Sequence, residues 1–230
     1  MAEAGSQAFR LMGLAQESPA GRIAILRMPT LSQHEIYGQG DCVPFSLELE
    51  RLKGRKKTHA PADMAGLYER IWKGSMPGLI SEQFSDRDVF YSSYLQAYIE
   101  RDVKEQVALT DTLLFSDFIR SAACRAGRML NVHDIAQDVG VSGDAAKRWL
   151  SVLEKSGILF YLRPYSNNLL KRTIKTPKLY FFDMGVVAYL TRYSSPEILA
   201  NGAMNGAILC MRPELTAVDR ENFIVPVWMV

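Results

Sequence analysis

The feature that most constrains this chain is the succession of patterns between residues 130 and 182. Apolar spacing predicts a short helix over 132–139 and a second helix over about 143–156. Between them lies Gly140-Val141-Ser142, a tight turn in which Ser142 is placed to cap the second helix. Apolar runs at 158–162 and 179–182 then predict two strands, joined by a polar and basic loop. Any fold of this chain must accommodate this order of elements.

Helix, three-residue turn, helix, strand, basic loop, strand is the order of elements in a winged helix-turn-helix domain. The second helix would bury Ala146, Trp149, Leu150 and Leu153 and turn the opposite face outward. A helix of this kind fits the major groove of DNA, and the loop can cover the adjacent backbone. The expected DNA-binding residues come from both elements: Ser142, Lys147, Arg148, Ser151, Lys155, Arg163, Lys171, Arg172 and Lys175.

The charge distribution points to the same region. The whole chain has a formal net charge of only +2, but residues 119–178 hold eleven Lys or Arg and four Asp or Glu, a net charge of +7. A basic block in a nearly neutral chain is typical of a surface that binds a polyanion. Two other interpretations stay open. The lysines can simply form a solvated surface, and Asp144 faces the same way as the basic residues, as in winged helices that contact proteins.

The rest of the chain predicts a mainly α protein with a small amount of β structure. Apolar stripes predict helices over 61–73, 86–109 and 111–126, whereas residues 37–62 have the glycines and prolines of a linker. Hydrophobic residues make up 48% of the chain, enough for a core. No apolar stretch approaches the about 18 residues of a membrane span, and the start lacks the pattern of a signal peptide. Three scattered cysteines favour a reduced compartment, so we expect a cytoplasmic protein.

Several catalytic patterns do not occur in the sequence. No Gly-Lys-Ser or Gly-Lys-Thr forms a P-loop, and no Gly-x-Ser-x-Gly is present. The three histidines (His34, His59 and His133) do not have metal-ligand spacing. Asp183 follows an apolar run but is expected to cap the helix that contains Val186 and Leu190. We therefore expect no catalytic residues, no metal site and no enzymatic activity in this chain by itself.

Several segments together resemble a known family. They are Gly5-Ser6-Gln7-Ala8-Phe9, Ala20-Gly21-Arg22-Ile23-Ala24, Ile71-Trp72-Lys73-Gly74-Ser75-Met76-Pro77, Tyr94-Leu95-Gln96-Ala97-Tyr98-Ile99-Glu100-Arg101-Asp102-Val103, and Pro177-Lys178-Leu179-Tyr180-Phe181-Phe182-Asp183. In this order they look like the bacterial and archaeal AAA-type "ATP-binding protein" family. That family joins a P-loop ATPase core, an uncharacterised winged-helix domain and a C-terminal domain with a restriction-nuclease-like fold.

The resemblance implies four regions. Residues 1–60 would be the C-terminal remnant of the ATPase core, 61–110 a helical bridge, 111–200 the winged-helix domain and 201–230 a remnant of the nuclease-like domain. Ser6 and Gln7 match the family's sensor position, and Arg22 matches a residue that could face a nucleotide phosphate. Because both Walker motifs are missing, the chain looks like a truncated member. It also looks internally deleted, because residues 201–207 resemble the entry to the nuclease-like domain and residues 215–228 resemble the family's last strand segment, with the intervening fold missing. ATP and Mg²⁺ are implied only for intact relatives, and no cofactor is expected here.

The resulting hypothesis is a non-catalytic fragment whose winged helix binds DNA. One alternative is that the winged helix is a protein-interaction module, contacting its own ATPase core, another subunit or a second copy, without binding DNA. Another alternative is an ATPase subunit whose P-loop comes from a separate chain. Exposure of Lys147, Arg148 and the loop at 163–178 on one continuous face distinguishes DNA binding from the first alternative.

Overall fold

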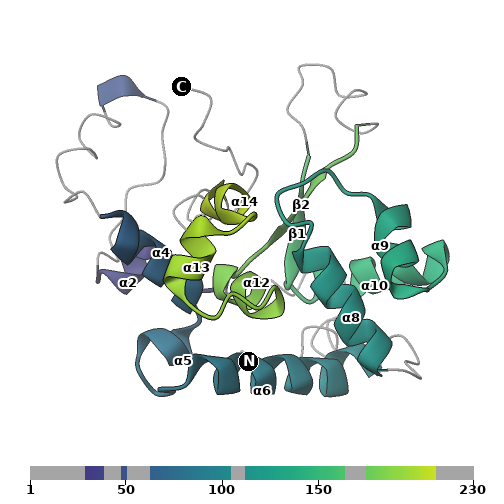
Figure 1. Ribbon diagram of the computed structural model, residues 1–230, viewed down its shortest axis with the longest axis horizontal. Coiled ribbons are helices and arrows are strands. Elements are labelled where there is room, and N and C mark those ends of the chain that lie inside the picture. Colours follow the sequence, from purple (N-terminus) through teal and green to yellow (C-terminus); the bar gives the residue numbers. More distant parts are fainter. Residues whose placement is uncertain (1–28, 39–47, 51–62, 105–111, 164–174, 211–230) are drawn as a thin grey trace, which may run out of the picture. The chain divides into compact units, whose positions relative to one another are not determined.

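The computed structural model describes residues 29–38, 48–50, 63–104, 112–163 and 175–210 (Figure 1). As predicted, this part of the chain is mainly helical with one small antiparallel sheet. It divides into two compact units, the first formed within residues 86–182 and the second within residues 30–85 and 183–210. The regions expected at 61–110 and 111–200 therefore each contribute residues to both units.

The core of the first unit is formed by three helices, α8 (Thr112–Ala123), α9 (Val132–Val139) and α10 (Gly143–Lys155). Phe115 and Phe118 of α8 are completely buried, and both rings meet Trp149 of α10 edge to face, with centroids 5.2 and 5.1 Å away. Edge-to-face aromatic pairs add to the gain from apolar burial. This cluster therefore holds α10 against α8.

The sheet of the first unit pairs β1 (Leu159–Leu162) with β2 (Lys178–Phe181) in antiparallel register, with Leu159 opposite Phe181. Leu159, Leu179 and Phe181 are buried. On the alternate positions the ring of Phe160 lies 5.6 Å from that of Tyr180 and 4.8 Å from that of Phe182. The two strands are thus fixed by an apolar face and by a row of aromatic rings.

A third segment, between α8 and α9, pairs with the other edge of β2. The amide of Leu179 donates to the carbonyl of Arg128 (3.0 Å), and the amide of Leu130 donates to the carbonyl of Pro177 (2.8 Å). Met129 lies opposite Lys178 in an isolated antiparallel bridge. Successive residues of a strand direct their hydrogen bonds to opposite edges, so β2 is flanked by β1 and by this segment. The sequence analysis did not predict this pairing.

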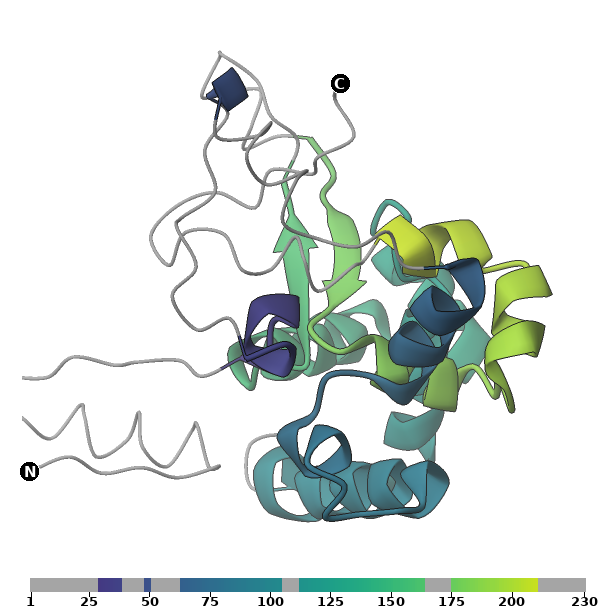
Figure 2. The same cartoon turned by 90° about the vertical axis from the view of Figure 1, so that its left-hand side faces the viewer.

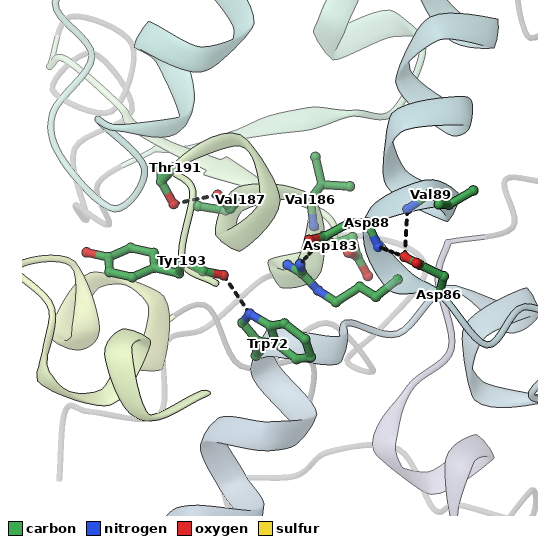
Figure 3. Close-up of polar contacts among 10 residues, drawn as sticks. Trp72, Asp86, Asp88, Val89, Asp183, Val186, Val187, Thr191 and Tyr193 are labelled. Atoms are coloured by element: carbon green, nitrogen blue, oxygen red, sulfur yellow. Dashed lines mark hydrogen bonds and ion pairs between the residues drawn. The ribbon is translucent and has the colours of Figure 1, made fainter. Parts of the chain in front are cut away.

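One long helix was expected over 86–109, but the α-helical part, α6, covers only Arg87–Tyr98. Asp86 caps it by accepting hydrogen bonds from the amides of Asp88 and Val89, both at 2.9 Å (Figure 3). At Tyr98 the α-helical pattern gives way to a π-helix, η1 (Ile99–Val103). The Tyr98 hydroxyl hydrogen-bonds that of Ser156, at 2.7 Å, and so connects α6 with the C-terminus of α10.

The second unit contains α2 (Gln33–Ile36), α4 (Met64–Lys73), α5 (Pro77–Ile80), α12 (Met184–Leu190), α13 (Pro196–Asn201) and α14 (Asn205–Cys210). Helix α4 packs against α12 and α13, as Figure 2 shows. The indole of Trp72 donates to the carbonyl of Tyr193, at 2.6 Å (Figure 3). Asp183 caps α12 by accepting from the amide of Val186, at 2.9 Å, which confirms the role predicted for it.

In the first unit a cluster of three polar side chains joins α8 to α9. The hydroxyl of Ser121 donates to the carboxylate of Asp138 (2.8 Å), and Arg125 forms an ion pair with the same carboxylate (2.6 Å). The hydrogen bond from Ser121, together with the hydrogen bond and charge of Arg125, lowers the pKa of Asp138 below its usual value of 3.8. The folded protein therefore binds a proton at Asp138 more weakly than the unfolded chain does. The ionised carboxylate of Asp138 stabilises the fold, and this stabilisation is complete at pH values well above 3.8.

This contribution is expected to disappear as the pH falls through the lowered pKa of Asp138. We therefore expect Asp138→Asn to be less stable than the wild type near neutral pH, with the difference shrinking below about pH 4. Unfolding midpoints measured from about pH 3 to about pH 7 test this. Asp134→Asn controls for the loss of a carboxylate from the same helix. A wild-type advantage that is as large in acid as at neutral pH would contradict this role of Asp138.

Candidate nucleic-acid interface

The geometry of the turn before α10 is set by two local features. Gly140 ends α9 in the left-handed conformation, with φ of 77°, which glycine adopts without the steric cost of a Cβ atom. Ser142 then caps α10 as predicted, because its hydroxyl accepts from the amide of Ala145, at 3.2 Å. The two helices are therefore joined by a defined turn, as in a helix-turn-helix.

Helix α10 has an apolar face and an exposed basic face. Ala146, Leu150 and Leu153 are buried. The basic side chains predicted to face outward (Lys147, Arg148 and Lys155) are all exposed, whereas Ser151 is half-buried. Buried positions take one side of the helix because they recur every three to four residues. The structure thus places four of the predicted DNA-binding residues on the outward side of one helix.

The predicted residues of the loop are described only at its ends. Arg163, directly after β1, and Lys175, shortly before β2, are both exposed. Lys171 and Arg172 lie outside the described residues, as do Ser6, Gln7 and Arg22. Arg128 is a further exposed basic residue, in the segment that pairs with β2. Arg128 belongs to the basic block of the sequence, but the pairing that places it beside the hairpin was not predicted.

Two acidic residues on α10 reduce its positive charge. Asp144 lies 3.5 Å from Lys147 in an ion pair whose side chains are 85% and 68% exposed. Glu154 is exposed near the other end of the helix. Burial, followed by the negative charge of Glu154, raises the pKa of Tyr161. The phenol of Tyr161 therefore stays neutral at physiological pH and adds no negative charge to this side of the unit.

In the part of the chain that the structure describes, no three His, Cys, Asp or Glu side chains are grouped in a way that could hold a metal ion. In the same ranges no helix is both long and apolar enough to cross a membrane.

The described residues form a mainly helical protein in which two helices joined by a tight turn are followed by a β-hairpin. The particular family follows from sequence comparison: the family model described as "Domain of unknown function (DUF8612)" matches residues 64–197, and the chain belongs to this family. The match extends over parts of both compact units.

Two curated relatives come from mycobacteria. An uncharacterised protein of Mycobacterium tuberculosis and one of Mycobacterium bovis are each 24% identical to the chain over 185 residues. The matched part is 80% of this chain but only 36% of each relative, so the chain spans about a third of their length. No solved structure gives a significant match.

Proposed function

We propose that residues 112–182 form a winged helix-turn-helix that binds duplex DNA, with α10 as the recognition helix. The single observation that carries this proposal is the exposure of Lys147, Arg148 and Lys155 on the side of α10 opposite its buried stripe. Cationic side chains on such a helix can neutralise phosphates and reach base edges in the major groove. No catalytic role is proposed for this chain.

The order and pairing of the elements support the same proposal. Helix α8 is followed by the segment at 127–130, then by α9, α10, β1 and β2. The segment, β2 and β1 pair in that order across the sheet. This order and pairing support the proposal, because a winged helix combines a helix for the groove with a β-hairpin beside it. Arg163 and Lys175 flank the loop of this hairpin with exposed positive charges.

Binding of a short mixed-sequence duplex, measured by fluorescence anisotropy over a salt titration, tests the proposal. If about six phosphates are neutralised, the logarithm of the affinity should fall with the logarithm of salt concentration with a slope of roughly −5. The Lys147→Ala, Arg148→Ala double variant should bind more weakly, and its slope should be flatter by about 2. Both side chains are exposed, so the circular dichroism spectrum should stay native.

A matched control removes two positive charges elsewhere. Lys104 follows η1 and Arg192 follows α12, and both are exposed. The Lys104→Ala, Arg192→Ala double variant should retain the wild-type slope, because neither residue lies on α10 or the hairpin. The proposal would be overturned if the wild-type protein showed no binding to DNA at about 50 mM salt. It would also be overturned if the α10 double variant bound DNA as tightly as the wild type.

A second candidate function is a protein-interaction module. It is favoured by the acidic residues of α10, since Asp144 already pairs with Lys147. The same unit also has exposed apolar side chains, with Leu113 76% and Met129 61% exposed. The same titration separates the candidates, because a protein-binding surface predicts no salt-dependent affinity for DNA.

The resemblance to AAA-type ATP-binding proteins supports a wider proposal for longer members of the family. The mycobacterial relatives extend well beyond the matched region. We propose that in longer relatives an ATPase core acts on the DNA or partner held by the winged helix. ATP and Mg²⁺ belong to that proposal alone. A subunit completed by a P-loop from a second chain stays as the alternative.

A further inference from the structure

Asp144 is the acidic residue that least fits a surface for a polyanion. It is the second residue of α10 and lies in the same stripe as Arg148, Ser151 and Lys155, four, seven and eleven positions on. Its side chain is 85% exposed. A carboxylate on a face that meets phosphates weakens binding through charge repulsion. Asp144 must therefore make some favourable contact if this face binds DNA.

Asp144 neither caps α10 nor packs in the core, which are two common roles of a residue at the start of a helix. The cap of α10 is supplied by Ser142, whose hydroxyl accepts from the amide of Ala145. The exposure of Asp144 excludes a part in the core. An acid in the first turn does interact favourably with the helix dipole, but this benefit is small at an exposed position. Lys147, at 3.5 Å, forms an exposed ion pair with the carboxylate.

The position of Asp144 matches a specific part of a helix-turn-helix complex. The N-terminal residues of a recognition helix are those that contact base edges in the major groove. There a carboxylate accepts a hydrogen bond from the N4 amino group of cytosine, whereas the acceptor atoms of guanine and the O4 of thymine repel it. Adenine offers its N6 amino group beside the N7 acceptor, which repels the carboxylate, so cytosine is the preferred partner. An acid at this point of the helix therefore costs affinity for most DNA sequences and recovers it best at cytosine.

We infer that Asp144 is the specificity-determining residue of the interface and reads cytosine in one base pair of the bound duplex. This inference rests on the proposed DNA binding and deepens it. Lys147, which pairs with this carboxylate, and Arg148 and Lys155 supply contacts that do not depend on sequence. The expected discrimination at that base pair is about tenfold, as for other single contacts to base edges.

The experiment selects duplexes with randomised central positions, using the full chain at about 50 mM salt. Affinities are then measured for two duplexes that differ only at the selected base pair. The wild type should prefer cytosine there by about tenfold. Asp144→Ala should lose this preference while binding mixed-sequence DNA at least as tightly. Asp144→Asn should shift the preference to adenine, because an amide side chain pairs with N6 and N7 of adenine.

Glu154→Ala provides the matched control, since it removes one exposed acid from the same helix far from its N-terminus. It should bind all duplexes more tightly and keep the preference for cytosine. Saturable binding without a preferred base, or the same preference in Asp144→Ala, would overturn the inference and leave the proposed DNA binding intact. Absence of saturable binding by the wild type would overturn both.

Discussion

Replacing Phe118 with alanine should destabilise the first unit by about 4 kcal/mol, the loss typical of truncating a fully buried aromatic ring. The side chain of Phe118 is completely buried. Its ring lies 5.1 Å from that of Trp149 and 6.2 Å from that of Phe115, so the substitution removes contacts that join α8 to α10. Small domains are stable by only about 5–15 kcal/mol, so a substantial fraction of this margin is lost. Denaturant unfolding followed by circular dichroism measures the effect.

Leu113→Ala is the control for this prediction, because Leu113 lies on the same helix and is 76% exposed. It should change the free energy of unfolding by no more than about 0.5 kcal/mol. Since Phe118 holds α10 in place, DNA binding by the Phe118→Ala variant should also fall as the first unit loosens. Equal stability of the Phe118 and Leu113 variants would show that the aromatic cluster is not the core of this unit.

The second large effect is expected at Asp183, in the second unit. Its carboxylate is 3% exposed and accepts from the amide of Ser75 (2.7 Å), the hydroxyl of Ser75 (3.0 Å) and the amide of Val186 (2.9 Å). Asp183→Ala removes the cap of α12 and takes away the carboxylate acceptor of the amides of Ser75 and Val186. Hydrogen bonds to a charged group and an N-cap each contribute about 1–3 kcal/mol, and such losses are not additive. We expect a destabilisation of about 3 kcal/mol, measured by equilibrium unfolding.

Two variants define the origin of this effect. Asp63 caps α4 with an exposed side chain that accepts from the amide of Gly66, at 2.9 Å, so Asp63→Ala should cost only about 1 kcal/mol. Asp183→Asn keeps one side-chain oxygen but turns an amino group toward donors, and it should fall between the two alanine variants. If Asp183→Ala costs no more than Asp63→Ala, the buried contacts with Ser75 contribute nothing beyond an ordinary cap.

Short-range sequence patterns were sufficient to predict the two helices of the candidate site. Helix α9 occupies the predicted residues, Val132–Val139, and α10 ends within one residue of its predicted end. The cap at Ser142, the left-handed Gly140 and the exposed face of α10 all follow from residues within one or two turns. The basic residues of that face could therefore be identified from sequence spacing alone. Lys171 and Arg172, in the loop, lie outside the described residues.

Apolar periodicity and capping residues act over three or four positions, so they were enough to locate the helices and strands. The pairing of distant segments, in contrast, is seen only in the folded chain. The segment at 127–130 pairs with β2, and Asp183 receives hydrogen bonds from Ser75, 108 positions away in the chain. Helices α12 and α13 also pack on α4. Strand pairing and the choice of buried partners depend on contacts between remote residues, and no short-range pattern in the sequence encodes them.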